Sequence, residues 1–265
     1  MRLSTIFYPD KPWGNHMDIN KLTSKTRKAA EDFNMISAGD KIAVGLSGGK
    51  DSVALLKILS ELRRYYPEKF ELIAITVDLA FKNSPTDYTP LKELCKSLGV
   101  PFYLVKTEIG EIVFDVRKEP NPCSLCSKMR KGALYNKAAE LGADKVALGH
   151  HADDLTDTFL LSMFYEGRLS TFPPKLKLEK TGITVIRPMI YLRECEISSY
   201  AKANLPIVKS ECPANKHTKR EEVKTIVKDL NKQIPGVRRM IFTALTHPER
   251  YNLFDKFVKD ACKDD

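Results

Sequence analysis

The sequence predicts an α/β fold in which an open parallel sheet carries helices on both faces, with helical additions at both ends. Short runs rich in β-branched residues alternate with longer helical patterns, and each expected strand ends in Gly, Asp or Lys. Alternation of this kind is typical of βαβ units, whose crossover helices cover the two faces of a parallel sheet. Hydrophobic residues make up 43% of the 265 positions, which is enough to bury a large core.

Five segments have the composition of buried strands, namely residues 41–45, 71–77, 102–106, 145–148 and a fifth near 183–187. Helical patterns fill the intervals, at about residues 21–35, 52–64, 88–98, 126–141, 154–165, 194–203, 219–232 and 238–245. The chain contains no internal repeat and no low-complexity linker. We therefore predict one core at residues 39–190, a helical extension at residues 1–38 and a helical region at residues 191–265.

The chain is basic, with 43 Lys and Arg residues against 34 Asp and Glu residues and a net charge of +9. The excess gathers in three clusters, Lys21/Lys25/Arg27/Lys28, Lys128/Arg130/Lys131 and Lys216/Lys219/Arg220/Lys224. Such clusters are compatible with a polyanionic partner such as a nucleic acid. The alternative is that each cluster is a solvated helix face, which is the usual role of a charge run.

The sequence favours a cytoplasmic protein. Its first residues contain no apolar leader, and no window approaches the roughly 18 apolar residues of a membrane span, so we expect no membrane association. The six cysteines, without a secretory signal, indicate reduced thiols used in packing or as ligands.

A glycine-rich turn, Ser47-Gly-Gly-Lys-Asp-Ser52, joins the first expected strand to the next helix. Backbone N–H groups at the start of a helix form a ready anion site, and phosphate is its natural occupant. A Walker A loop would need Gly at Val44 and Ser or Thr at Asp51, so the ordinary P-loop is excluded. The alternative for a bare Gly-Gly pair is a tight turn without a ligand.

Polar residues also follow two other strands. Asp78 ends the second strand, at the sheet edge where ligands of open α/β folds bind, and is a candidate contact for a ribose or a metal ion, unless it only caps a turn. Gly149, His150, His151, Asp153 and Asp154 follow the fourth strand. We expect Asp154 to cap the next helix and Asp153 to face the site. Two adjacent histidines do not easily bind one metal ion.

Cys123 and Cys126 form a C-x-x-C at the start of a helix, and Cys212 is the one other cysteine in a polar, loop-like context. The pair can converge on one metal or cluster but does not complete a site. Three interpretations remain open: a redox dithiol, a zinc site completed by a residue such as His217, and a cluster with one ligand from outside the protein. Cys95 has the spacing of a core residue.

Three stretches resemble the tRNA 2-thiocytidine synthetase family: KTRKAAEDFNMISAGDKIAVGLSGGKDS, PCSLCSKMRKGALYNKAAELGADKVALGHHADD and TFLLSMFYEGRLSTFPPK. The likeness runs from about Lys21 to Asn252. The SGGKDS string alone marks the wider superfamily of N-type ATP pyrophosphatases, and its combination with C-S-L-C-S and G-H-H-x-D-D narrows the match. The resemblance implies a PP-loop ATPase core with the adenine nucleotide alpha hydrolase-like fold.

The resemblance also implies roles for particular residues. Cys123, Cys126 and Cys212 would hold a 4Fe-4S cluster with one open iron, although family members often have a second C-x-x-C where this chain has Cys212 followed by Pro213. The implied ATP contacts are Ser47, Gly48, Gly49, Lys50, Asp51, Ser52, Asp78, Gly149, His150 and Asp154. The implied catalytic residues are Lys50, Asp51, Arg130 and Asp153. Asp51 would place Mg²⁺, and Arg130 would face the cluster or the ATP phosphates.

The function implied is that of an ATP-dependent tRNA sulfurtransferase. Such an enzyme adenylates the C2 carbonyl of the anticodon-loop cytidine at tRNA position 32 and replaces its oxygen with sulfur. Its partners would be tRNA and a sulfur donor such as a cysteine desulfurase or free sulfide, and the sequence leaves room for a homodimer, whose tRNA contacts would come from residues 191–265.

Three alternatives remain at this stage. Thiolation of another tRNA position, for instance to 2-thiouridine, would use the same residues. An adenylating ligase of the same superfamily would have no use for Cys123, Cys126 and Cys212. A zinc-containing nucleic-acid-binding protein would leave the residue 47–52 loop unexplained.

Overall fold

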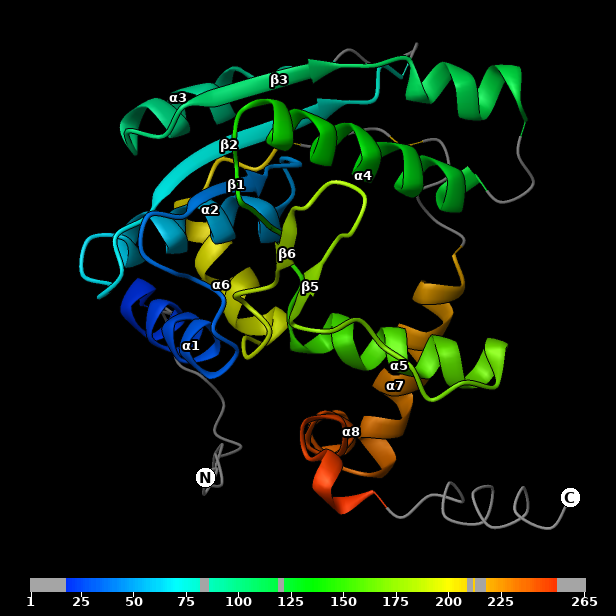
Figure 1. Cartoon of the computed structure of the whole chain (residues 1–265). Helices are drawn as coiled ribbons and strands as arrows, with labels where there is room; N and C mark the ends of the chain where they lie inside the picture. Colours follow the sequence, from blue (N-terminus) through cyan, green and yellow to red (C-terminus); the bar gives the residue numbers. More distant parts are fainter. Residues whose placement is uncertain (1–17, 82–85, 119–121, 209–211, 213–217, 252–265) are drawn as a thin grey trace, which may run out of the picture.

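Six strands form one sheet, in the order β3-β2-β1-β4-β6-β5 (Figure 1). The computed structural model describes residues 18–81, 86–118, 122–208, 212 and 218–251. The strands are β1 Lys41–Gly45, β2 Glu71–Asp78, β3 Phe102–Lys106, β4 Lys145–Ala147, β5 Lys175–Lys177 and β6 Thr184–Ile186. All neighbours pair in parallel except β5, which runs antiparallel to β6. The predicted α/β fold with an open parallel sheet is confirmed.

The helices follow the predicted sequence of elements, with boundaries shifted by a few residues. They are α1 Ile19–Asp32, α2 Lys50–Leu62, α3 Thr89–Ser97, α4 Pro122–Glu140, α5 Ala152–Glu166, α6 Glu194–Asn204, α7 Lys219–Gln233 and α8 Val237–Thr246. Two short elements were not predicted, the π-helix Glu111–Val116 and the 3-10 helix Pro248–Arg250. Across the described residues, no helix is both long enough and apolar enough to cross a membrane.

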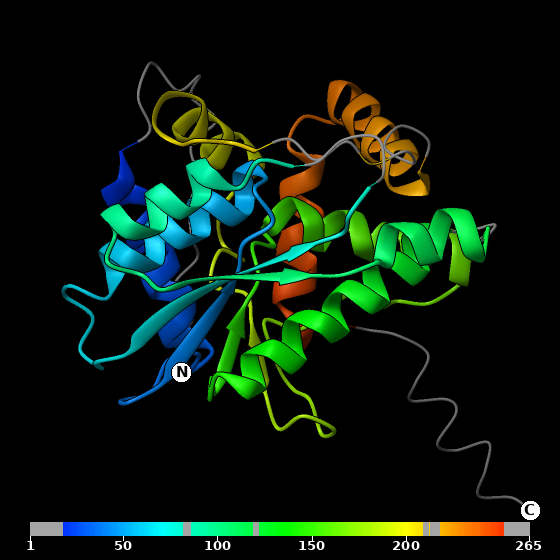
Figure 2. The ribbon, with the colours of Figure 1, turned by 90° about the horizontal axis from the view of Figure 1, so that it is seen from above.

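The two faces of the sheet are covered by different helices (Figure 2). Leu22 of α1, Leu55 of α2, Leu91 of α3 and Ile197 of α6 belong to one buried cluster. Leu134 of α4 belongs to a second cluster on the opposite face, together with the π-helix. Helices α5, α7 and α8 pack on one another beyond the sheet edge, as Figure 1 shows. The helical additions therefore join the core at both ends of the chain.

The strand order creates a switch point between β1 and β4. From β1, the chain continues to β2 and β3 on one side, whereas β4 and β6 lie on the other. Crossover helices leave opposite faces at such a point, which opens a crevice at the carboxyl ends of the two strands. The loops that follow β1 and β4 are residues 46–49 and 148–151. The fold thus brings the glycine-rich turn and the Gly-His-His segment to one edge.

The start of the sheet is held by a buried ion pair. Lys145 in β4 contacts Asp40, which precedes β1, and both side chains are 10% exposed. Asp40 also accepts a hydrogen bond from the backbone N–H of Ser37 at 2.6 Å. Removal of one partner from a buried pair leaves the other charge uncompensated.

We predict that Asp40→Asn lowers the free energy of unfolding by about 3 kcal/mol, because Lys145 then stays buried without a counter-charge. Denaturant titration measures the effect. Glu140→Gln is the matched control, since it breaks the exposed Lys137–Glu140 pair (2.6 Å) and should cost no more than about 1 kcal/mol. Equal losses for the two variants would contradict the structural role of the buried pair.

Candidate active site

The glycine-rich turn is closed by its own two serines. The Ser52 hydroxyl accepts hydrogen bonds from the backbone N–H and the hydroxyl of Ser47, both at 3.0 Å, and donates to the carbonyl of Gly49 at 2.9 Å. Gly48 has a φ of 85°, in the left-handed region that favours glycine. Gly49 is the N-cap of α2 and provides no side-chain cap. The first N–H groups of α2 are therefore available to an anion.

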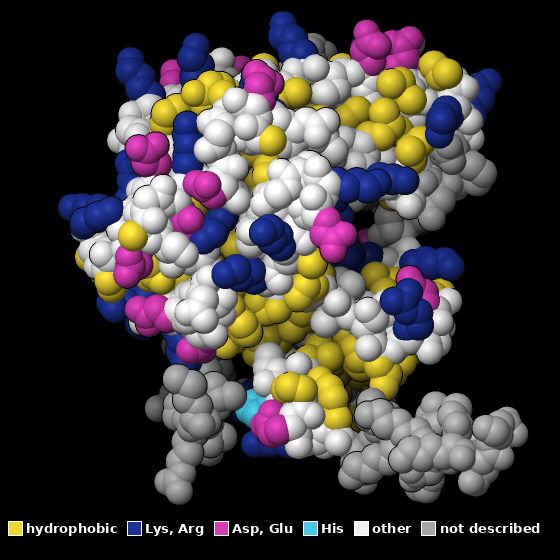
Figure 3. Space-filling model, viewed as in Figure 1, with side chains coloured by type: hydrophobic (Ala, Val, Ile, Leu, Met, Phe, Trp, Pro, Cys, Tyr) yellow, Lys and Arg dark blue, Asp and Glu magenta, His cyan; other side chains and the backbone are white. Residues whose placement is uncertain are grey.

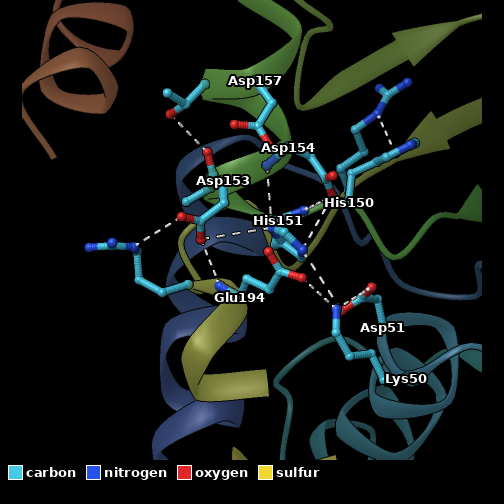
Figure 4. Close-up of polar contacts among 12 residues, drawn as sticks. Lys50, Asp51, His150, His151, Asp153, Asp154, Asp157 and Glu194 are labelled. Atoms are coloured by element: carbon cyan, nitrogen blue, oxygen red, sulfur yellow. Dashed lines mark hydrogen bonds and ion pairs between the residues drawn. The ribbon is translucent and has the colours of Figure 1, made fainter. Parts of the chain in front are cut away.

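Lys50 and Asp51 lie in the first turn of α2 and form an ion-pair network with Glu194 of α6 (Figure 4). The Lys50 ammonium is 3.0 Å from each Asp51 carboxylate oxygen and 3.0 Å from Glu194 Oε1. Burial opposes the charge of Lys50, but the two carboxylates outweigh it and raise its pKa. Burial likewise opposes the charge of Glu194, yet Lys50 lowers the pKa of that carboxyl. Lys50 is thus a fixed cation at the mouth of the turn.

The segment after β4 packs directly on this turn. A Cβ added to Gly149 would lie 3.0 Å from the carbonyl carbon and oxygen of Asp51 and 3.2 Å from the amide nitrogen of Ser52. These contacts are with backbone atoms, which cannot rotate away. Gly149 therefore lets the loop after β4 approach the start of α2.

His151, and not Asp154, is the N-cap of α5. Its Nδ1 accepts a hydrogen bond from the Asp154 N–H at 3.3 Å, and Asp154 Oδ2 accepts one from the His151 N–H at 3.2 Å. This reciprocal capping box corrects the expectation that Asp154 itself caps the helix. Buried His151 also places Nε2 3.8 Å from Asp51 Oδ1 and 3.5 Å from Asp154 Oδ2. It links the two loops, a role that the sequence did not reveal.

Asp153 is buried beside the start of α6. Its Oδ2 accepts a hydrogen bond from the Glu194 N–H at 2.6 Å, and its Oδ1 lies 3.3 Å from Arg238 of α8. Arg238 also binds Asp157 at 2.8 Å. These contacts orient Glu194, whose side chain in turn binds Lys50. A catalytic role for Asp153 stays a prediction.

His150 points to the other side of the segment. Its Nδ1 accepts a hydrogen bond from Arg187 Nε at 3.2 Å, and its ring lies 4.8 Å from that of Phe172. Burial first, and then the charge of Arg187, lower the pKa of His150 to about 4. His150 is therefore neutral at physiological pH. A contact between His150 and ATP stays a prediction.

Asp78 lies at the end of β2 and caps the turn that follows, whereas a contact between Asp78 and a ribose or metal ion stays a prediction. Its Oδ1 accepts hydrogen bonds from the Ala80 N–H at 3.1 Å and from the Tyr88 hydroxyl at 3.2 Å. Burial raises the pKa of Tyr88, Asp78 raises it further, and Arg130 of α4 lowers it. Arg130 therefore lies within electrostatic range of the Asp78–Tyr88 pair, at the same edge of the sheet.

Cys126 lies within electrostatic range of both Cys123 and Cys212, although Cys212 is far from it in sequence. Cys123 and Cys126 lie in the first turns of α4, which begins at Pro122 and not at Cys126 as predicted. Burial raises the pKa of Cys126, Cys212 and Cys123 raise it further, and Arg130 lowers it. All three are free thiols. Cys212, Cys123 and Arg130 thus all lie within electrostatic range of Cys126. That the three cysteines hold one cluster stays a prediction.

The zinc interpretation receives no support from the described residues. Among them, no three His, Cys, Asp or Glu side chains converge closely enough to hold a metal ion, and His217 lies outside the described residues. A four-iron cluster binds each thiolate through a different iron, so its cysteines stand farther apart than the ligands of one ion. Cys95 is buried in the core, as predicted, and burial raises its pKa to about 11. Cys195 is exposed, and Cys262 lies outside the described residues.

Comparison with known proteins decides the family. A family model described as PP-loop domain matches residues 20–233. A tRNA-cytidine(32) 2-sulfurtransferase from Bordetella avium is 40% identical over 93% of this chain and 78% of its own length. One from Syntrophotalea carbinolica is 39% identical over 91% of this chain and 93% of its own length.

This chain belongs to the tRNA-cytidine(32) 2-sulfurtransferase family. The family predicted from the sequence is confirmed, and with it an enzyme of the sulfurtransferase class. Among solved structures, the U34-tRNA thiolase NcsA from Methanococcus maripaludis, described with its [4Fe-4S] cluster, is similar with a TM-score of 0.70. That likeness has 25% identity and covers 88% of this chain and 80% of the other.

For this sulfurtransferase, we predict that Gly149→Ala weakens ATP binding about tenfold, a change of about 1.4 kcal/mol, because the added methyl group displaces the start of α2. Isothermal titration with ATP measures the affinity. Gly132→Ala in α4 is the control, since its Cβ would meet no atom within 4 Å and alanine favours a helix. An unchanged ATP affinity in the Gly149 variant would show that the contact with α2 is not needed for nucleotide binding.

Proposed function

We propose that this protein catalyses ATP-dependent thiolation of the cytidine at tRNA position 32, with AMP and pyrophosphate as the other products. The observation that carries the proposal is that Cys123, Cys212 and Arg130 all act electrostatically on Cys126, while Arg130 also acts on Tyr88, whose hydroxyl donates to Asp78 at the sheet edge. Thiols for sulfur chemistry and a turn for ATP phosphates thus share one edge of the sheet. The names of the relatives support the same reaction.

The chemistry starts from the poor leaving ability of a carbonyl oxygen. The C2 oxygen of cytidine attacks the α-phosphorus of ATP, pyrophosphate leaves, and the oxygen becomes part of an AMP leaving group. A sulfide nucleophile then adds to C2, and AMP departs with the original oxygen. With sulfide as the donor, no oxidant or reductant is needed, because sulfur has the same oxidation level in sulfide and in the C=S group that forms.

The residues of the turn assist the first step. The free N–H groups of α2 and the Lys50 ammonium would stabilise the charge that gathers on departing pyrophosphate. Asp51 is suited to placing Mg²⁺, whose preferred ligands are oxygen atoms. Glu194 would hold Lys50 until phosphate oxygens replace its carboxylate.

The three cysteines would suit a 4Fe-4S cluster, because they are free thiols and because Cys123 and Cys212 both lie within electrostatic range of Cys126. When bound by three thiolates, such a cluster would supply an open iron that can hold sulfide. The raised pKa of Cys126 means that its proton must be displaced when a metal binds. Arg130 favours the thiolate at this position.

The substrate base must be accessible, since a stacked and paired base hides the atom to be replaced. An anticodon loop meets this requirement at small cost. Residues 191–265 would provide tRNA contacts. Free sulfide would provide sulfur directly, whereas the persulfide of a cysteine desulfurase would need a two-electron reductant, such as two thiols that form a disulfide, to release sulfide. A homodimer is compatible with this scheme.

We predict that Lys50→Ala and Asp51→Ala each reduce the rate of thiolation at least about 100-fold, as expected when a group that stabilises developing charge is removed. Liquid chromatography of digested tRNA measures 2-thiocytidine. Lys57→Ala is the control, because Lys57 lies on the same helix but pairs with Glu61 at 2.7 Å. Wild-type rates in either variant would remove the turn from the mechanism.

We predict that serine at Cys123, Cys126 or Cys212 removes both iron and thiolation, whereas ATP still binds because the glycine-rich turn belongs to another part of the chain. The proteins are made without oxygen and assayed for iron, zinc, ATP affinity and thiolated nucleosides. Cys195→Ser is the matched control and should keep its iron. A Cys212→Ser protein with full iron and full thiolation would reject the three-cysteine site, and 2-thiouridine as product would redirect the substrate assignment.

A further inference from the structure

The basic clusters of the sequence have different fates in the structure. In the first cluster, Lys25 pairs with Glu196 at 2.5 Å, Arg27 with Glu31 at 2.7 Å and Lys28 with Asp32 at 3.1 Å. These charges are neutralised by neighbouring carboxylates, as expected of a solvated helix face. Lys131, from the second cluster, instead lies within electrostatic range of Arg220, from the third, and of Arg187, a cation that the sequence did not single out.

Arg187 follows β6 and is 8% exposed. Its Nη1 donates to the carbonyl of Pro173 at 2.6 Å, its Nε donates to His150 Nδ1 at 3.2 Å, and its guanidinium lies over the Phe172 ring at 4.8 Å. Among the described residues, no carboxylate forms an ion pair with Arg187, and Nη2 makes none of these bonds. A buried guanidinium without a counter-charge is costly unless an anion joins it.

Lys131 and Arg220 approach Arg187 from α4 and α7. Partial burial lowers the pKa of Lys131, and the charges of Arg187 and Arg220 lower it further. Arg220 is held by Asp154 at 3.4 Å and by Thr158 at 3.1 Å. Within the part of the chain that the structure describes, Lys131 has no acidic partner. Asp154 is thus the one carboxylate of the described residues found to offset three cations.

The location suits the substrate. Figure 3 shows a hollow between α4 and the pair of α5 and α7, with Lys and Arg side chains at its edge. Lys131 follows Arg130 in α4, the helix that also carries Cys123 and Cys126. The nucleotide phosphates already have an anion site at the start of α2, and the carboxylates of Asp51 and Asp154 lie between that site and Arg220.

We propose that Lys131, Arg187 and Arg220 form a binding site for one backbone phosphate of the substrate RNA, next to the nucleotide that reacts. The inference rests on the proposed function, because it assumes an RNA substrate. Phe172 and His150 act as positioning residues that hold the Arg187 fork. A phosphate bound here would fix the register of the RNA strand relative to the cysteines.

The test uses the iron-loaded enzyme and an anticodon stem-loop RNA. We expect Lys131→Gln to weaken RNA binding roughly tenfold, to lower the salt slope by about 0.7 and to leave ATP affinity unchanged. Lys131→Arg should keep most of the affinity. Lys137→Gln is the matched control and should bind RNA as the wild type does. Lys137 lies at the far end of α4 and pairs with Glu140.

Neutralisation of single phosphates identifies the contact. A methylphosphonate at one position beside the target base should weaken binding by the wild type about tenfold but not weaken Lys131→Gln further, because the same interaction is already lost. Equal sensitivity of both proteins at every position would show diffuse attraction and overturn the site. Weaker ATP binding with unchanged RNA binding would assign the cations to nucleotide phosphate, which also overturns the proposal.

The two hypotheses fail in different ways. If the wild type binds and thiolates the RNA while Lys131→Gln behaves like the wild type, only the phosphate site is wrong. If the wild type neither binds nor thiolates the RNA, the proposed function fails, and the phosphate site fails with it. Lys131 has an exposed side chain, although its ammonium is partly desolvated, so its substitution tests the site with less folding risk than a change at buried Arg187.

Discussion

The buried carboxylate of Asp153 is the constraint on which the arrangement of the site depends. It accepts the N–H of Glu194 at 2.6 Å, and its charge is balanced by Arg238 at 3.3 Å and Arg193 at 3.6 Å. A charge with 6% residual exposure is tolerated only with such partners. Because Asp153 fixes the start of α6, it also fixes Glu194, which holds Lys50. The glycine-rich turn is thus connected to α8 through Lys50, Glu194, Asp153 and Arg238.

The C-terminal helices α7 and α8 form ion pairs with acidic residues of α5 and α6. Arg238 of α8 binds Asp157 at 2.8 Å as well as Asp153, and Lys224 of α7 lies 3.9 Å from Glu194. Burial raises the pKa of Asp157, whereas Arg238 lowers it. The helices that follow the core therefore supply the cations that neutralise its buried acids. A core truncated before these helices would lack Arg238, the counter-charge of both Asp153 and Asp157.

The sequence predicted most of the fold because strands β1 to β4 and β6 are apolar and the helices have clear periodicity. It missed β5 because Lys175-Leu176-Lys177 is short, charged and exposed at a sheet edge. The Ser-Gly-Gly-Lys-Asp-Ser turn was identifiable because its chemistry is local. The roles of Glu194, His151 and Arg187 could not be predicted from the sequence. Each depends on a contact with a residue more than 30 positions away, namely Lys50, Asp51 and His150 respectively.

The periodicity of helix α4 places Cys123, Cys126 and Arg130 on one face and Lys131 on another. Cys123, Cys126 and Arg130 are separated by three and four residues, so they share one face, toward Cys212 and the Asp78–Tyr88 pair. Lys131 is one position further, about 100° around the axis by the geometry of a 3.6-residue turn, and faces Arg187 and Arg220 instead. One rigid helix therefore sets the distance between thiols and the cation cluster. A substrate strand that spans these two faces would have its reacting base placed by the helix itself, which is the form of positioning that group transfer requires.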